Sequence, residues 1–110
     1  MEQIIHLGEI FQYSTQDIEI TVDADTSSWT DAYVTFGSLE GIAVVEKGMA
    51  DLTLSGGTIS FSLTQAETGL LPVPKCLMQI NAIDDGKRPV SYKGSFDVYT
   101  NLHAEVIEVE

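Results

Sequence analysis

Residues 55–64, Ser-Gly-Gly-Thr-Ile-Ser-Phe-Ser-Leu-Thr, decide the fold class of this chain. The adjacent glycines at 56 and 57 can adopt positive φ at little steric cost, which is typical of a tight β-hairpin turn. After them Ile59, Phe61 and Leu63 alternate with serines. A period of two places apolar side chains on one face of a strand. The stretch therefore predicts a hairpin whose second strand has one buried face.

The same alternation recurs on both sides of this hairpin. Residues 17–23 and 32–36 alternate upstream, and 75–83 and 89–98 alternate downstream around an Asp85-Gly86 turn. Within 75–83 the inward phase carries Cys76, Met78, Ile80 and Ala82. Strands at roughly ten-residue spacing with turn signals between them are typical of a sandwich or barrel. We predict an all-β protein, an antiparallel immunoglobulin-like β-sandwich of seven to nine strands.

One segment breaks the strand pattern. Thr64 is a favourable helix N-cap, and Glu67 stands three residues later, which is the spacing of a capping box. Gly69 can end such a helix after a single turn. We therefore predict one short helical turn near residues 64–69. Farther on, Gly94 permits a bulge in the last hairpin strand.

The chain of 110 residues fits a single β-sandwich domain, residues 1–110. Its two ends are open to more than one interpretation. Residues 1–13 show no single strand face, and they are either an N-terminal arm or an edge strand with a bulge at Gly8. Residues 104–110 are either a final strand or a tail that reaches onto a neighbouring molecule.

Charge and hydropathy exclude several classes of function. With 17 acidic and five basic residues, the formal net charge is −12. Such a surface repels nucleic-acid phosphates and anionic lipid heads, so we expect neither nucleic acid nor membrane as a partner. No signal peptide or transmembrane run is recognised in the sequence. We therefore expect a protein that is cytoplasmic on synthesis.

No residue pattern predicts catalysis. His6 and His103 stand alone in the sequence, and no nucleophile elbow accompanies them. Cys76, the single cysteine, lies at an inward strand position where a thiol is inert. The acidic residues occupy polar faces and turns, which leave carboxyl pKa values unraised. We predict a protein that is not an enzyme, with no catalytic residue and no cofactor.

Three acidic residues gather around one predicted loop: Asp23, Asp25 and Asp31. Hard cations such as Ca²⁺ take several oxygen ligands from loops of this kind. The spacing of an EF-hand is absent, and we expect no metal site. A structural calcium site in this loop is the alternative, and a thermal melt with excess Ca²⁺ or chelator tests it.

The predicted interface residues are basic and aromatic. Lys87, Arg88 and Lys93 place three of the five basic residues on one hairpin, where an acidic patch of another subunit can dock. Tyr33 and Tyr92 add aromatic side chains of the kind that is enriched at interfaces. Trp29 is either a core residue or a member of an exposed stacking platform with these two tyrosines.

Several short elements carry a resemblance between Gly57 and Ile107. They are Thr58-Ile-Ser-Phe-Ser-Leu-Thr-Gln-Ala-Glu-Thr68, Leu70-Leu-Pro72, Met78-Gln-Ile80, Asp84-Asp-Gly86 and Gly94-Ser-Phe-Asp-Val98. This half of the chain resembles the immunoglobulin-like domain at the N-terminus of phage baseplate upper proteins and related small phage and prophage tail proteins. In that family the domain usually precedes a long fibre or receptor-binding region, which these 110 residues do not contain.

The resemblance implies a structural role without catalytic residues. We expect a phage or prophage tail or baseplate component that becomes virion-associated, forms a homo-oligomer and docks onto other tail or baseplate subunits. The alternative is a carbohydrate- or ligand-binding β-sandwich module, in which Trp29, Tyr33 and Tyr92 form the binding platform.

Overall fold

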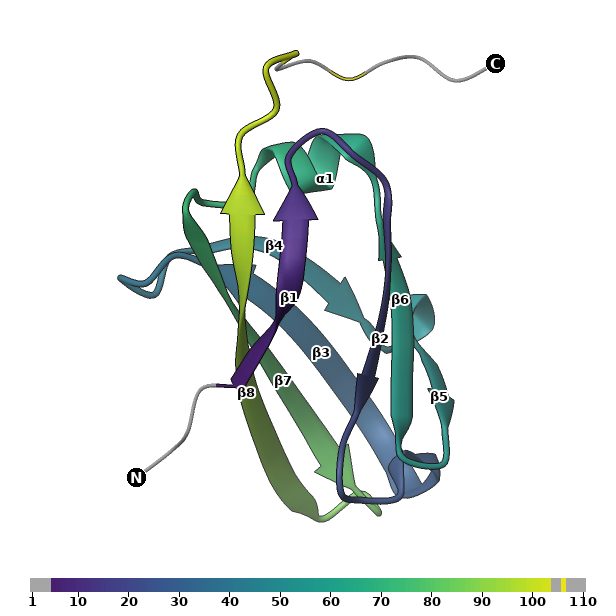
Figure 1. Cartoon of the computed structure of the whole chain (residues 1–110). Helices are drawn as coiled ribbons and strands as arrows, with labels where there is room; N and C mark the ends of the chain where they lie inside the picture. Colours follow the sequence, from purple (N-terminus) through teal and green to yellow (C-terminus); the bar gives the residue numbers. More distant parts are fainter. Residues whose placement is uncertain (1–4, 104–105, 107–110) are drawn as a thin grey trace.

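Two β-sheets pack face to face (Figure 1). The computed structural model describes residues 5–103 and residue 106. Sheet A contains, in spatial order, β1 (Ile5–Phe11), β8 (Arg88–Tyr99), β7 (Lys75–Asp84), β3 (Trp29–Gly37) and β4 (Ala43–Gly48). Sheet B contains β2 (Gln16–Thr21), β6 (Thr58–Leu63) and β5 (Thr53–Ser55). These eight strands in the described residues confirm the predicted all-β sandwich.

The strand order is immunoglobulin-like. In variable-type immunoglobulin domains strands C′, C, F and G share one sheet, and strands B, E and D share the other. Here β4, β3, β7 and β8 occupy the first set of positions, and β2, β6 and β5 occupy the second. The helical turn falls between β6 and β7, where the chain crosses from sheet B to sheet A.

Strand β1 is an edge strand of sheet A and pairs with β8 in the parallel sense, whereas the other paired strands are antiparallel. The reason is that residues 12–15 carry the chain from sheet A to sheet B, so β1 and β2 do not form a hairpin within one sheet. The register shifts between His6 and Gly8, where Gly8 has a φ of 147°. The pairing of β7 with β8 continues through Gly94 without the bulge that the sequence suggested there.

The core lies between the inward faces of the two sheets. Phe36 on β3 is fully buried, and its ring lies 5.9 Å from that of Phe61 on β6 and 6.0 Å from that of Phe96 on β8. The inward phases predicted for β6 and β7 are confirmed. Their buried residues are Ile59, Phe61, Leu63, Cys76, Met78, Ile80 and Ala82.

The predicted helical turn is α1 (Gln65–Gly69), and its capping box is formed. The backbone N–H of Glu67 donates to Thr64 Oγ1 at 3.2 Å, and the N–H of Thr64 donates to Glu67 Oε1 at 2.9 Å. The buried Thr68 hydroxyl donates to the carbonyl oxygen of Ser14 at 2.7 Å, which ties α1 to the crossing between β1 and β2. Two short 3₁₀ turns complete the helical structure: η1 (Thr26–Ser28) and η2 (Met49–Asp51).

Both predicted hairpin turns are present. Gly56 has a φ of 60° at the β5–β6 turn, while Gly57 serves a close approach: a Cβ there would lie 2.8 Å from the Val22 carbonyl oxygen. At the β7–β8 turn Asp85 and Gly86 have φ values of 53° and 68°, and two consecutive positive values are what a type I′ turn requires.

The strand or tail predicted at residues 104–110 lies outside the described residues, except for Val106, which is 49% exposed and belongs to no strand. In the part of the chain that is described, no helix has the length and apolar character needed to cross a membrane.

Candidate interaction surface

The two halves of β8 have different neighbours. Residues 94–97 lie between β7 on one side and β1 on the other, and Val98 and Tyr99 pair with β1. Residues 88–93 pair with β7, and within the described range no strand pairs with their other side (Figure 1). We call residues 88–93 the open edge. An edge of this kind presents backbone N–H and C=O groups that a further strand can use.

An apolar cleft of about 390 Å³ lies beside the open edge, between β8 and the end of β2. Strand β2 is itself an edge strand, of sheet B, so the cleft opens at the side of the sandwich. Six of the nine lining residues are apolar or aromatic: Leu7, Ile20, Val22, Met78, Ile80 and Tyr92. The other three are Thr21, Asp23 and Lys93. The cleft can therefore accept apolar side chains from a segment that pairs with the open edge.

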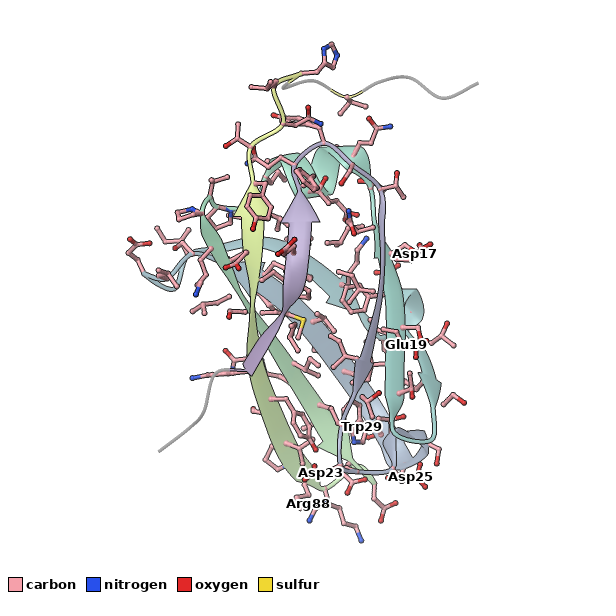
Figure 2. The ribbon with its side chains drawn as sticks, in the orientation of Figure 1. Asp17, Glu19, Asp23, Asp25, Trp29 and Arg88 are labelled. Atoms are coloured by element: carbon pink, nitrogen blue, oxygen red, sulfur yellow. The ribbon has the colours of Figure 1, made fainter. Side chains whose placement is uncertain are left out.

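The basic residues predicted for the interface lie along this part of the chain. Lys87 is exposed at the hairpin turn, and Lys93 is exposed at the other end of the open edge. The guanidinium of Arg88 donates to the Asp84 carboxylate at 3.0 Å, and Asp84 also accepts from the Ser28 hydroxyl at 2.5 Å. Figure 2 shows Arg88 at the same end of the sandwich as Trp29. Because Asp84 accepts from Arg88 on the hairpin and from Ser28 on η1, it connects the β7–β8 hairpin to η1.

The predicted aromatic residues do not gather on one surface. Tyr92 faces the sandwich interior beside Ile80, and its ring stacks on Trp29 at 6.2 Å. Tyr33 lies on the opposite face of sheet A, in register with Asn81, and is 43% exposed. Trp29 is 5% exposed and belongs to the core. The three-ring platform required by the ligand-binding alternative is therefore not formed, because its members point to different sides of one sheet.

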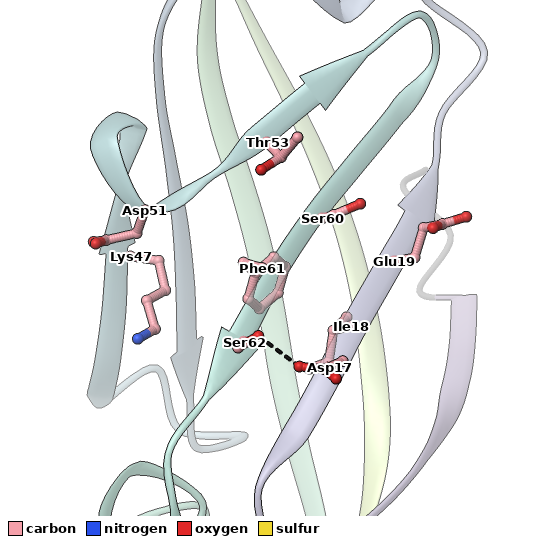
Figure 3. A pocket seen from close by; sticks show the side chains of 9 residues that line it. All are labelled: Asp17, Ile18, Glu19, Lys47, Asp51, Thr53, Ser60, Phe61 and Ser62. Carbon is pink, nitrogen blue, oxygen red and sulfur yellow. Dashed lines mark hydrogen bonds between the residues drawn. The ribbon is translucent and has the colours of Figure 1, made fainter.

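A second, polar groove of about 570 Å³ crosses the outer face of sheet B (Figure 3). Its carboxylates, Asp17, Glu19 and Asp51, are exposed to solvent. Asp17 accepts a hydrogen bond of 2.6 Å from the Ser62 hydroxyl. Lys47 at the groove's margin lies 2.8 Å from the Glu67 carboxylate. Asp17 and Lys47 thus have their hydrogen-bonding partners within the protein.

The Lys47 contact also affects the ionisation of Glu67. Burial acts to raise the pKa of this carboxyl, but the hydrogen bond from Lys47 and the bond from the Thr64 backbone outweigh it. The result is a pKa below the usual value. This charged pair joins β4 to α1 and serves the fold.

The candidate chemical groups are dispersed. Burial raises the pKa of the Cys76 thiol to about 11, so that the thiol is protonated at neutral pH. Hydrogen bonds from Ser27 hold the pKa of the exposed Asp25 below its usual value. His103 is exposed, and the side chain of His6 is outside the description. Among the described residues no group of three or more His, Cys, Asp or Glu side chains is placed to hold a metal ion.

The sequence did not reveal the cleft. Its lining residues follow the ordinary alternation of core positions, and nothing in the sequence indicates that the described part of β1 pairs only with residues 94–99 of β8. One sequence feature did indicate an edge. The strand begins with Arg88-Pro89, and charged residues and proline are common on edge strands.

No protein-family model and no curated protein matches this sequence. Among solved structures, the crystal structure of CopC from Methylosinus trichosporium OB3b is similar, with a TM-score of 0.52 and 16% identity over 86% of this chain and 89% of that chain. The solution structure of the first Ig-like domain of human CD48 antigen aligns with a TM-score of 0.42 and 14% identity over 99% of this chain and 93% of that chain. The likeness to CopC shows a shared fold and nothing of function.

Proposed function

We propose that this protein is a non-catalytic interaction domain that self-associates and docks onto other proteins through the open edge of β8. We further propose that it does so as a component of a phage or prophage tail or baseplate. The observation that carries the interaction role is the combination of a strand edge that no described residue pairs with and an apolar cleft directly beside it.

The physical argument concerns both backbone and side chains. An added strand gains main-chain hydrogen bonds from the edge, and a cleft gives specificity by accepting alternate side chains. Six strand residues span about 20 Å, which is the length of a usual strand. The exposed Lys87 and Lys93 at the two ends of this edge favour an acidic partner segment.

The non-catalytic character is supported by the state of the reactive groups. A thiol with a pKa near 11 supplies little thiolate at neutral pH. The carboxylates of the polar groove are exposed to solvent and lack the apolar surroundings that tune catalytic acids.

The phage assignment rests on the resemblance between Gly57 and Ile107. Its Leu63-Thr64 to Thr68 element corresponds to the capped turn α1, and its Asp-Gly element to the β7–β8 hairpin beside the open edge. The elements of the resemblance thus coincide with well-formed local structure.

Sedimentation velocity and light scattering of the full chain over a range of concentrations test the interaction role. We expect a concentration-dependent oligomer, or a complex with a protein encoded beside it. The charge reversal Lys87→Glu should weaken this association, whereas Lys75→Glu, the same change at an exposed site away from the cleft, should leave it unchanged. A monomer that binds none of the neighbouring gene products would contradict the proposal.

Mass spectrometry of particles purified after prophage induction tests the phage assignment. We expect the chain among the proteins of intact particles, at a ratio that matches the other tail subunits. Its absence from the particles, with the protein present in the lysate, would overturn this part of the proposal alone.

A further inference from the structure

We propose that the open edge of one copy binds residues 104–110 of a second copy as an added β-strand. We call residues 104–110 the tail segment. The inference rests on the self-association proposed above and adds to it the identity of the segment that is exchanged.

The edge and its cleft define what the occupant must be. It must be short, because the open edge has six residues between the turn and the start of the β1 pairing. It must be extended, without glycine or proline in its interior, to form a regular ladder. Alternate side chains must be apolar, because one face of an added strand meets the cleft.

The sequence of the tail segment meets these requirements. It reads Ala-Glu-Val-Ile-Glu-Val-Glu, with neither glycine nor proline. Over residues 107–110, Ile107 and Val109 share one phase of a strand and Glu108 and Glu110 share the other, whereas Glu105 precedes the apolar phase. The β-branched residues favour strands. Val106, the one described residue of the segment, is 49% exposed and unpaired in the single copy. Ile107 and Val109 are therefore positioned by sequence to enter the cleft together.

The charges of the two segments are complementary. Residues 87–93 contain three cations and no acid, of which Arg88 already pairs with Asp84, while residues 104–110 contain three acids and no cation. In a chain with a formal net charge of −12, a run of one positive sign is unusual, and it lies at the open edge. An acidic strand is attracted there and repelled by most of the remaining surface.

The tail segment of the same copy is too short to pair along the whole open edge. Asn101 Nδ2 donates to the Gln12 carbonyl oxygen at 3.1 Å, which holds the chain beside the far end of β1. From there to Lys93 the chain must run back past residues 94–99, a distance of about 20 Å. The nine residues 102–110 span at most about 32 Å when extended, so no more than three or four of them could pair with the open edge of their own copy. Pairing of Ile107 and Val109 along the whole edge therefore calls for a second copy.

The first test replaces Ile107 and Val109 by proline in the full chain, which prevents strand pairing without touching the described fold. We expect the self-association constant, measured by sedimentation equilibrium, to fall about tenfold or more. The matched control is Leu39→Pro at an exposed turn position, which removes an apolar side chain of 62% exposure away from the cleft. Equal association of the tail variant and the wild type would overturn the inference while leaving another mode of self-association in place.

The second test reverses charge on each side. Lys87→Glu takes the net charge from −12 to −14, and Glu108→Lys takes it from −12 to −10. General repulsion between acidic copies predicts opposite effects, whereas the proposed contact predicts that both single changes weaken association. Mixing the two variants should then restore a heteromeric complex. Weakening by Lys87→Glu together with strengthening by Glu108→Lys would overturn the inference.

Hydrogen exchange identifies which copy occupies the edge. We expect the protection of residues 88–93 to rise with protein concentration in the wild type and to stay low in the Ile107→Pro/Val109→Pro variant. If residues 88–93 were protected at every protein concentration, the open edge would be occupied by a segment of the same copy. That result would overturn the inference. A wild-type chain that stays monomeric overturns both this inference and the proposed self-association, and binding to a separate tail protein would then preserve the docking role alone.

Discussion

Residues 94–99 and residues 88–93 belong to one strand, and they show what a second neighbour does to it. Phe96 lies between β7 and β1, Val98 lies between β1 and the backbone of Pro74, and they are 5% and 2% exposed. Val90 and Tyr92 have the same inward phase, yet they are only half-buried. The comparison teaches that apolar alternation identifies the inward face of a strand. How deeply the side chains on that face are buried also depends on whether a second strand covers the strand's edge.

The largest expected effect compares an aromatic residue from each half. Phe96→Ala should lower the free energy of unfolding by about 3–5 kcal/mol, because it opens a cavity next to Phe36. Tyr92→Ala should cost about 1–2 kcal/mol, since its half-buried ring has less surface to lose. Urea denaturation of both variants measures the difference. Equal losses would show that the two halves are equally buried in solution.

The next effect concerns alkaline pH. Cys76 lies in register with Phe96, and burial raises its thiol pKa from 9.0 to about 11. The unfolded chain therefore releases this proton first, so stability is complete below pH 9 and falls as the pH rises toward 11, by about 2–3 kcal/mol. Denaturation of the wild type and of Cys76→Ala between pH 8 and 11 isolates this contribution. A constant difference between the two proteins across that range would contradict it.

A smaller effect is expected at the turn that begins the open half. Gly86 has a φ of 68°, and a Cβ added there meets only the Thr30 hydroxyl oxygen at 4.0 Å. Gly86→Ala should therefore cost about 1 kcal/mol through backbone strain alone. Gly48→Ala is the control, because Gly48 has a φ of −91° and its nearest neighbour atom lies at 3.9 Å. Thermal melts of both variants check this, and a Gly86 variant as stable as the control would be the contrary result.

The smallest effect leaves stability unchanged and is read by hydrogen exchange at low protein concentration. Residues 94–97 have a partner strand on each side, and the Val98 amide donates to the Pro74 carbonyl oxygen, so that half should exchange slowly. In residues 88–93 the amides that face away from β7 should exchange rapidly and alternate with protected ones. Uniform protection along β8 in dilute solution would mean that the two halves do not differ as described.

Local features of this fold follow from the sequence. The capping box of Thr64 and Glu67, the two hairpin turns and the inward phase of β7 depend on residues close together in the chain, and all are present. The parallel pairing of β1 with β8 joins residues about 90 positions apart, and it is set by how the sheets close rather than by any local pattern.

For the candidate surface too, the sequence predicted the features that depend on neighbouring residues and missed those that depend on how the sheets assemble. The sequence placed Lys87, Arg88 and Lys93 on one hairpin, because they are neighbours in the chain. It did not show that Tyr33 and Tyr92 point to opposite sides of sheet A, which depends on how β3 aligns with β7 and β8. The apolar cleft depends in addition on where β2 of the other sheet ends.

The chain that follows β8 leaves from the end of that strand away from the open edge, and this has a consequence for symmetry (Figure 1). A pair in which each copy both gives and receives a segment must place its two copies antiparallel about a two-fold axis. In a pair of copies that point the same way, one copy keeps an empty open edge and the other keeps an unused tail segment. Each can bind a further copy, so the contact repeats and builds a ring or a filament. The relative direction of β8 in neighbouring copies thus determines whether the assembly stops at two copies.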